Sequence, residues 1–372
     1  KHQEFQISLH CLFIDFKQTF DSLHIGLGMF SIHRIPSKYV RLITNTLVNT
    51  TSKVRIHGKL TTPIIINSGV RQGDALSTTI FNLMLNYAIK EIDPRGNIFH
   101  KSIQICAYAD DIVIIARNVL DLKETFTKLV RLTENLGLKV NQLKTKYMKK
   151  TTAMASQRNQ DLVVGDYIFE SVENFTYLGV KFNNIRDTEE AVQDRLQAAN
   201  RAFYMYAKVF RSRLISRNTK FRLYKTLIRP VLTYGCEVWK MKTKELNQIE
   251  IFERKILRRI FGSVRLGENE YRGRYNYELE ELINRRNVRR FIKAQRIKWL
   301  GHVIRMPDDS TVKRVFNARP EGRRRRGRPR RRWLDAVEED INRMGIRNYR
   351  ITALDRQIWG QIAEDALAHT EL

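Results

Sequence analysis

The sequence predicts an α+β protein in which a domain of strands and helices precedes a purely helical region. Up to residue 185, short apolar segments typical of strands alternate with segments of helical periodicity. From residue 187 onward the strand-like segments stop, and amphipathic helical segments follow one another. These observations favour an antiparallel sheet with its helices packed on one side, followed by an all-α region and a basic helical C-terminal region.

Each element of the first domain follows from its local pattern. Residues 7–15 are apolar and β-leaning and end on an acid, and residues 53–67 alternate around a glycine, as in a hairpin. Ser37, directly after Pro36, suits the N-cap of a helix. We further expect an apolar helix, two strands broken by paired acids, an amphipathic helix closed by Gly137, and a pair of small hairpins, at residues 76–89, 103–116, 121–137 and 162–182.

The helical region is predicted to begin with three amphipathic helices that are basic on one face, at residues 188–211, 217–234 and 244–261. Pro230 and Gly235 punctuate them, and a glycine-containing loop near residues 262–274 marks a boundary. Further helices are expected at residues 285–300 and after Trp333 and Asn348. The aromatic side chains of the first helices are expected in the bundle core rather than under stacked bases: Phe203, Tyr204, Tyr206, Tyr224 and Tyr234.

Positive charge is the strongest feature of the composition. The 372-residue chain carries 67 lysine and arginine residues against 39 acidic residues, a formal net charge of +28. The excess runs through the whole chain, with +8 on residues 1–185 and +10 on each of residues 186–262 and 263–372. An enzyme of small metabolites rarely needs such an excess, whereas a phosphate polyanion favours it, so we expect a nucleic-acid partner.

Cysteine content and hydropathy limit the cellular compartments in which the protein is expected. Cys11, Cys106 and Cys236 are too few and too scattered for a disulfide framework or a structural zinc site, which indicates a reducing compartment. No uncharged apolar run approaches the roughly 20 residues that span a bilayer, and no secretory signal opens the chain. We therefore expect an intracellular protein, nuclear and cytoplasmic, without a membrane partner. Because the chain begins with Lys1 almost inside a strand, we expect it to be part of a longer polypeptide.

Acidic residues at strand ends suggest phosphoryl-transfer chemistry. Such chemistry uses two divalent cations about 4 Å apart, bridged by carboxylates on a rigid scaffold. Asp15 ends an apolar strand in LFIDF, and Asp110 and Asp111 sit at the tip of AYADDIVII. Adjacent acids flanked by apolar residues are costly unless they are exposed or bind a cation. The alternative is an ordinary polar hairpin turn, since aspartate is a good turn former.

Five segments follow one another along the chain: FIDFKQTFDSL, SGVRQGDALS, YADD, GLKVNQLKTKYM and FTYLGVKF, at residues 13–23, 68–77, 108–111, 137–148 and 175–182. In this order they resemble the motifs of reverse transcriptases, most closely those of non-LTR retrotransposons. The similarity continues through RLYKTLIRPVLTYGCEVW, FERKILRRIFG and IKWLGHVIRM. This resemblance implies a polymerase palm over residues 1–185, a helical thumb over 186–262 and a basic helical C-terminal region over 263–372.

The resemblance also implies roles for individual residues. Metal binding falls to Asp15, Asp110, Asp111 and the carbonyl of Phe16, and protonation of the leaving pyrophosphate to Lys144. Phe20 would select deoxynucleotides, and Gln72 and Gly73 would hold the incoming nucleotide. The primer grip, the segment that contacts the primer end, corresponds to Tyr177, Leu178 and Gly179. On the residues alone, Phe20 could equally be a core side chain and Lys144 a solvated surface lysine.

An RNA-directed DNA polymerase is therefore expected, with two Mg²⁺ ions, or Mn²⁺ in their place, as cofactors. Its partners would be an RNA template, a DNA primer and deoxynucleoside triphosphates, and the sequence indicates no oligomeric state. Only fourteen residues precede Asp15, so the fingers region and the upstream endonuclease of the family are expected to be missing. The alternative is a catalytically inactive, nucleic-acid-binding remnant of such an element.

An arginine-rich linker is predicted at residues 322–332. Such a run repels itself and should remain extended without a polyanion. Its RGRP core resembles an AT-hook, which binds the A·T minor groove, but a localisation signal or a non-specific nucleic-acid tether are further interpretations. The candidate nucleic-acid-binding residues are Arg323, Arg324, Arg325, Arg326, Arg328, Arg330, Arg331 and Arg332.

Overall fold

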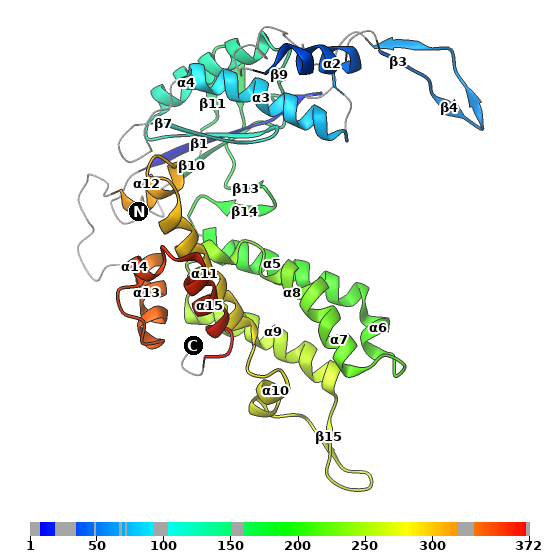
Figure 1. Cartoon of the computed structure of the whole chain (residues 1–372), viewed down its shortest axis with the longest axis vertical. Coiled ribbons are helices and arrows are strands. Elements are labelled where there is room, and N and C mark those ends of the chain that lie inside the picture. The colour runs from blue at the N-terminus through cyan, green and yellow to red at the C-terminus, as the bar shows by residue number, and fades with distance from the viewer. Residues whose placement is uncertain are drawn as a thin grey trace. The chain divides into compact units, whose positions relative to one another are not determined.

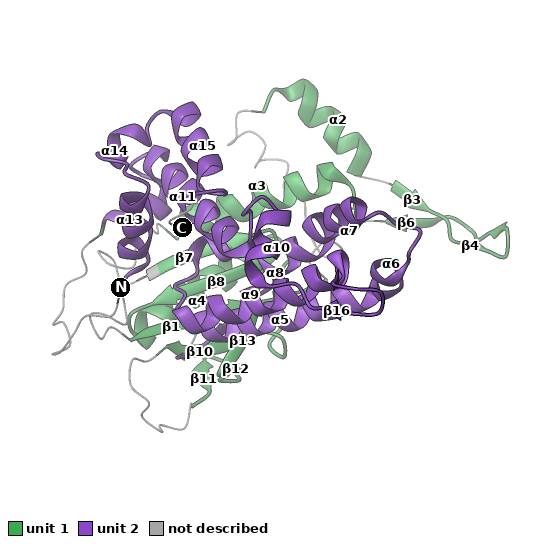
Figure 2. Ribbon diagram, turned by 90° about the horizontal axis from the view of Figure 1, so that it is seen from below, with its two compact units in different colours: residues 1–178, 318–325 green, residues 179–317, 326–372 purple. Residues whose placement is uncertain are grey.

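The protein is described by a computed structural model, which confirms the predicted α+β class. It describes residues 8–18, 35–47, 50–66, 69–70, 73–92, 103–150, 160–185, 187–318 and 331–369. The chain divides into two compact units (Figure 2). We call the one that comprises residues 1–178 and 318–325 the sheet unit, and the one that comprises residues 179–317 and 326–372 the helical unit.

A four-stranded antiparallel sheet forms the centre of the sheet unit. Its strand order is β10-β1-β8-β7. The bounds of these strands are β1 (Leu9–Ile14), β7 (Ile103–Tyr108), β8 (Asp111–Ala116) and β10 (Lys146–Lys150). Helices α3 (Ala75–Glu91) and α4 (Val119–Glu134) cover one face of this sheet (Figure 1). This is the predicted arrangement, with the helices on one side.

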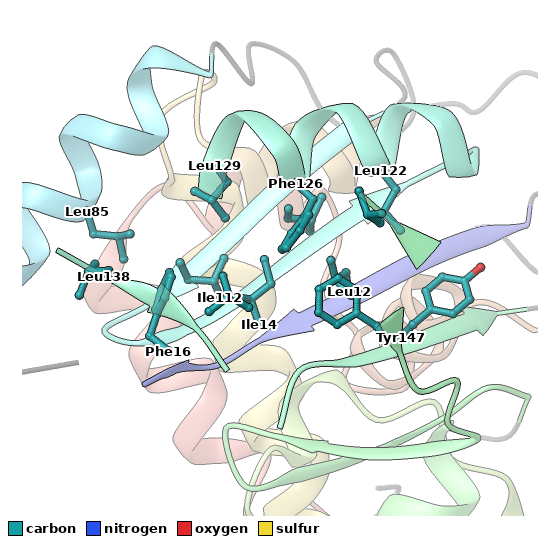
Figure 3. Packing of buried hydrophobic residues seen from close by; sticks show 14 of the residues in the cluster. Leu12, Ile14, Phe16, Leu85, Ile112, Leu122, Phe126, Leu129, Leu138 and Tyr147 are labelled. Atoms are coloured by element: carbon teal, nitrogen blue, oxygen red, sulfur yellow. The ribbon is translucent and has the colours of Figure 1, made fainter. Parts of the chain in front are cut away.

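The central strand β1 is buried on both faces, which explains its apolar run from Cys11 to Ile14. Leu12 and Ile14 point toward α4, where they pack with Ile112 against Phe126 and other side chains of the core (Figure 3). The alternate residue Phe13 faces the opposite side and is also buried. A run of apolar residues without polar alternation is typical of a strand that is buried on both faces.

Shorter elements complete the sheet unit, and one cap prediction is wrong. Helix α2 (Ser37–Leu47) begins at Ser37 instead of being capped by it, because the Pro36 carbonyl accepts the first helical hydrogen bonds. The predicted hairpin is confirmed as β3 pairing with β6 and β4 with β5. The remaining strands have these bounds: β2 (Phe16–Lys17), β3 (Thr50–Ser52), β4 (Arg55–Ile56), β5 (Lys59–Leu60), β6 (Ile64–Ile66), β9 (Lys139–Val140), β11 (Leu162–Val164), β12 (Tyr167–Phe169) and β13 (Asn174–Tyr177).

The helical unit follows the predicted pattern with two breaks in its helices and one correction: the segment predicted as a loop near residues 262–274 contains a short antiparallel hairpin, so the region is not purely helical. The first predicted helix is interrupted at Tyr206, and the second contains the π-helix Tyr224–Ile228. Pro230 has no N–H to donate to the carbonyl of Thr226, which favours a wider turn at this point. The elements are β14 (Val180–Asn183), α5 (Asp187–Met205), α6 (Ala207–Arg211), α7 (Arg217–Leu223), α8 (Arg229–Leu232), α9 (Thr243–Phe261), β15 (Val264–Arg265), β16 (Tyr271–Arg272), α10 (Asn276–Leu282), α11 (Val288–Arg305), α12 (Thr311–Asn317), α13 (Trp333–Arg343), α14 (Tyr349–Thr352) and α15 (Arg356–Asp365).

Helix α11 joins two apolar cores of the helical unit. Its first half, with Val288 and Ile292, belongs to the core formed by α5, α8 and α9. Its second half, with Ile297 and Leu300, belongs to a core shared with α13 and α15. The division into a thumb at residues 186–262 and a C-terminal region at residues 263–372 stays a prediction. No helix in the described ranges combines the length and apolar character needed to cross a membrane.

Close packing of α11 on α15 makes Gly301 sensitive to substitution. A Cβ at Gly301 would stand 2.1 Å from Cδ1 and Nε1 of Trp359, which is fully buried and donates its indole N–H to the Ile297 carbonyl. We expect Gly301→Ala to destabilise the helical unit by about 1–3 kcal/mol through overpacking. Gly360→Ala, which meets nothing within 4 Å, should be neutral or stabilising. Equal denaturant midpoints for the two variants would contradict this packing.

Glu253 on α9 makes the stability of the helical unit dependent on pH. Burial raises the pKa of this carboxyl to about 7, against hydrogen bonds from the Val288 N–H and the Tyr224 hydroxyl that lower it. The folded state therefore binds this proton more tightly than the unfolded chain, whose ordinary value is 4.5. The stabilisation that comes from the protonated Glu253 is complete below pH 4.5 and is lost as the pH rises toward 7.

We expect the free energy of unfolding of the helical unit to fall by up to about 3 kcal/mol over this window because of Glu253. In Glu253→Gln this part of the fall should disappear, because the amide does not titrate. Denaturant titrations at closely spaced pH values measure both. A variant that keeps the slope of the unaltered protein would show that another group is responsible.

Candidate active site

The register of the central sheet brings the predicted acids together. Ile14 pairs with Ile112 between β1 and β8, and Tyr108 pairs with Asp111 between β7 and β8. Asp15, one residue beyond Ile14, therefore continues the register opposite Asp111. Asp110 occupies the turn between β7 and β8. The three carboxylates thus meet at one end of the sheet, as the sequence predicted for acids at strand ends.

The turn that carries Asp110 has a strained backbone. Ala109, the first of its two residues, has φ +51°, a conformation that residues with a Cβ rarely adopt. Two-residue hairpins need positive φ at this position to match the twist of their strands, and glycine or asparagine usually provides it. Alanine instead keeps a short side chain beside the acids at some cost in free energy, as is found at functional sites.

Asp15 has an unusual environment for a carboxylate. Its Oδ2 atom is buried and has no hydrogen-bond partner among the described residues, and Nζ of Lys144 lies 3.9 Å away. Burial is the main cause of a raised pKa, and repulsion from Asp110 adds to it. The charge of Lys144 and a hydrogen bond from the Asn141 side chain oppose this rise. A buried, unpartnered carboxylate oxygen suits a cation that satisfies it.

Asp111 is held by a contact to the predicted primer grip. The Tyr177 hydroxyl donates to the Asp111 carbonyl at 3.1 Å, and the Tyr177 ring packs 5.8 Å from the ring of Phe13 on β1. Phe175, two residues earlier on β13, stacks on Phe13 at 4.2 Å. Strand β13 is therefore anchored to the sheet next to the acids. Desolvation is the main cause of a raised pKa of the Asp111 carboxyl, and the charges of Asp110 and Asp15 raise it further.

The loop between β9 and β10 fixes Asp15, a role that the sequence did not reveal. The Asn141 N–H donates to the Asp15 carbonyl at 2.8 Å, and the Asp15 N–H donates to Oγ1 of Thr145 at 3.2 Å. Within the loop, the Lys144 N–H donates to Oδ1 of Asn141. The only available signal was that Asn141 and Thr145 flank Lys144 in a short polar segment after a strand.

The acids fit a divalent cation chemically but do not form a complete cage. Among the residues described, no three or more histidine, cysteine, aspartate or glutamate side chains are arranged to hold a metal ion. Mg²⁺ does not require such a cage, since it is usually bound by one or two carboxylates together with waters and substrate phosphates. The Asp15 oxygen that lacks a hydrogen bond from the described residues and the raised pKa values of Asp15 and Asp111 indicate a site that a cation would stabilise.

Other predicted residues lie around this end of the sheet or outside the described residues. Phe16 is buried in the core, and its backbone pairs with Val140 of β9. Gly73 has φ +92°, and the following Asp74 caps α3 by accepting from the Leu76 N–H. Phe20 and Gln72 lie outside the described residues, and their roles stay predictions. The same holds for Arg323, Arg324, Arg325, Arg326, Arg328 and Arg330.

The remaining predicted residues occupy turns or helix ends. Leu178 and Gly179 form the two-residue turn after β13, with φ of +48° and +71°. Glycine adopts such angles freely, whereas for leucine they are an outlier. Arg331 and Arg332 precede α13 directly: Arg331 forms an ion pair with Glu339, and the Arg332 N–H donates to the Asp335 carboxylate. These two arginines therefore have structural contacts, and their binding role stays a prediction.

An antiparallel sheet with helices on one face and acids at adjacent strand ends is the arrangement expected of a polymerase palm. In a comparison with protein-family models, residues 2–182 match reverse transcriptase (RNA-dependent DNA polymerase). These residues of the chain therefore belong to the reverse transcriptase family, whose members use divalent metal ions.

Curated relatives come from transposable elements, mostly non-LTR retrotransposons. An uncharacterized transposon-derived protein from Caenorhabditis elegans is 26% identical over 69% of this chain and 90% of its own length. The RNA-directed DNA polymerase from mobile element jockey of Drosophila melanogaster is 23% identical, over 68% of this chain but 28% of the relative. A solved telomerase structure from Candida tropicalis aligns with 81% of this chain and 48% of its own at 14% identity, and its TM-score of 0.43 supports no inference.

The hydrogen bond from Asn141 can be tested through the titration of Asp15. Because this bond stabilises the charged carboxylate, Asn141→Ala should raise the pKa of Asp15 further, while the charge of Lys144 remains. Carboxyl-carbon NMR titration measures the shift. Gln142→Ala, in the same loop, should leave the Asp15 titration unchanged. An unchanged or lowered Asp15 pKa in Asn141→Ala would contradict the assigned contact.

Proposed function

We propose that this chain acts as an RNA-directed DNA polymerase of a non-LTR retrotransposon, joining deoxynucleotides to the 3′-hydroxyl of a DNA primer on an RNA template. The observation that carries the proposal is the meeting of Asp15 with Asp110 and Asp111 at one end of the sheet, where no hydrogen bond from the described residues satisfies Oδ2 of Asp15. The family match of residues 2–182 supports it. The chain spans 28% of the length of the jockey polymerase. The activity of that polymerase is therefore not evidence for the activity of this chain, which is an inference.

In this proposal the acids would hold two Mg²⁺ ions, or Mn²⁺ in their place. When bound, the ions activate the primer hydroxyl and stabilise the charge that develops on the transferred phosphate. The chain itself supplies rigid positioning: Asn141 and Thr145 fix the backbone of Asp15, and Tyr177 fixes that of Asp111. Preorganised groups of this kind need no reorganisation during the reaction.

Lys144 is proposed as the proton donor to the leaving pyrophosphate. Its side chain is 71% exposed, and its Nζ atom lies 3.9 Å from Oδ2 of Asp15. It is thus close to the acids while no short ion pair immobilises it. A mobile cation at this place can approach the developing negative charge of the leaving group. The surface-lysine alternative predicts no effect of Lys144 on the rate of nucleotide addition.

The substrates and partners are assigned in the same way. Phe20, Gln72 and Gly73 are proposed to hold the deoxynucleoside triphosphate, and the turn Tyr177–Gly179 to contact the primer. The basic helices of the helical unit are proposed to follow the phosphates of the template–primer duplex, which position a duplex without reading its sequence. The arginine-rich residues 323–332 are proposed as a non-specific tether, in a protein that is both nuclear and cytoplasmic.

Primer extension tests this proposal directly. On an RNA template with Mg²⁺, Asp110→Asn should lower the extension rate by at least about a hundredfold, because it removes one charge from the site without changing its shape. Asp166→Asn, an exposed carboxylate in the β11–β12 turn of the same unit, is the matched control and should extend normally. Filter binding should show unchanged nucleic-acid affinity for both variants.

Two outcomes would reject the assignment. Normal extension by Asp110→Asn would remove the acids from the chemistry. No extension by the unaltered chain, with nucleic-acid binding retained, would favour the alternative, a catalytically inactive nucleic-acid-binding remnant.

A further inference from the structure

The helical unit contains a basic pocket of about 440 Å³ that has no part in the proposed polymerase site. It lies between α5, α6 and α9. The side chains that give it its character are Arg211, Lys255, Arg258, Arg259 and the aromatic rings of Phe203 and Tyr204. No acidic residue lines it. We refer to this feature as the basic pocket.

The charges of the basic pocket have no internal compensation. Lys255, Arg258 and Arg259 stand three and four positions apart on α9 and therefore share one helix face, where like charges destabilise a helix. In the described part of the chain, neither Arg211 nor Arg259 has an ion pair or a side-chain hydrogen bond. An anionic ligand would remove this repulsion and satisfy their donors.

The aromatic rings of the pocket differ in burial, contrary to the expectation that all would lie in the core. Phe203 is 6% exposed and belongs to the core of the bundle, whereas Tyr204 is 60% exposed. Nζ of Lys255 lies 5.7 Å from the centroid of the Tyr204 ring. An exposed ring beside cations offers one surface for a base and neighbouring charges for its phosphates.

A pair of exposed tyrosines adjoins the basic pocket. Arg258 donates to the Arg274 carbonyl and to Oδ1 of Asn276, and Arg274 donates to the carbonyl of Gly262 at the pocket edge. These bonds hold the segment that carries Tyr275 and Tyr277 next to the pocket. The two rings stack with centroids 5.8 Å apart and are 55% and 61% exposed. The guanidinium of Arg272 lies 4.4 Å from the Tyr275 centroid.

We propose that the basic pocket and this tyrosine pair bind single-stranded nucleic acid, with phosphates in the pocket and unpaired bases stacked on the exposed rings. A duplex would offer its phosphates but not its base faces, so exposed tyrosines favour an unpaired strand. A free nucleotide could fill the pocket with the same chemistry, but it would leave the tyrosine pair unused. This binding needs neither the acids nor a divalent ion, so it goes beyond the proposed polymerase reaction.

The charge part of the site can be tested by fluorescence anisotropy in the presence of EDTA. The double variant Arg211→Gln/Arg259→Gln should weaken binding of a labelled single-stranded RNA or DNA oligomer at least about tenfold. The slope of log affinity against log salt should decrease by about 1.4, for two lost phosphate contacts on a single strand. Lys298→Gln/Arg356→Gln removes the same charge from exposed positions on α11 and α15, outside the pocket and outside the basic helices α5–α9, and should change affinity less than about twofold.

The stacking part is tested without any change of charge. Tyr275→Leu/Tyr277→Leu should weaken single-strand binding at least about fivefold while leaving affinity for a duplex of equal length within about twofold. Equal losses for strand and duplex would overturn the proposal in favour of backbone binding. Full competition by a mononucleotide would overturn it in favour of a free-nucleotide site. Unchanged single-strand binding by the pocket variant would reject the site itself.

The two proposals fail independently. Asp110→Asn should leave single-strand binding in EDTA intact, so a loss of extension without a loss of binding concerns only the polymerase proposal. A loss of binding in the pocket variant, with normal extension on a preformed template–primer duplex, concerns only the single-strand site.

Discussion

The antiparallel register of β1, β8 and β7 is the constraint on which the rest of the structure depends. It pairs Ile14 with Ile112 and thereby places Asp15 opposite Asp111. A slip of one residue would move Leu12 and Ile14 from the helix-covered face to the opposite one, because side chains alternate along a strand. The apolar core therefore fixes the register, and the register fixes the acids. The strand pairing that forms the apolar core therefore also places the acids of the candidate site.

Placing three carboxylates close together is electrostatically unfavourable, and the residues around them offset only part of this unfavourable energy. Desolvation and repulsion from neighbouring carboxylates raise the pKa values of Asp15 and Asp111, and for Asp15 the charge of Lys144 and the hydrogen bond from Asn141 offset this only in part. The backbone groups of both acids are instead held by neutral hydrogen bonds, which keep the geometry without cancelling the charge. A site built in this way is rigid but electrostatically unsatisfied, which favours cation binding. In the helical unit the basic pocket shows the same principle with the opposite sign.

Sequence patterns revealed the acids because strand ends and tight turns are local features. They also located most helices, and Pro230 marked the place of the π-helix without predicting it. The supporting contacts were beyond reach, since Asp15 and Thr145 lie 130 positions apart and Tyr177 and Asp111 lie 66 apart. Amphipathic periodicity likewise places Tyr204 on a helix but does not tell whether its ring meets the core or solvent. The features that sequence patterns did not predict are tertiary contacts, and these contacts hold the residues of each site in place.

Asp15, Asp110 and Asp111 are proposed to form a divalent-cation site. Mn²⁺ binding, measured by electron paramagnetic resonance, tests whether they do. At neutral pH, Asp15→Asn should weaken Mn²⁺ binding at least about tenfold, while Asp166→Asn should not. The affinity for Mn²⁺ should also decrease as the pH is lowered, because protons compete with the ion for carboxylates whose pKa values are raised. Equal Mn²⁺ affinity of the unaltered chain and Asp15→Asn would contradict the account.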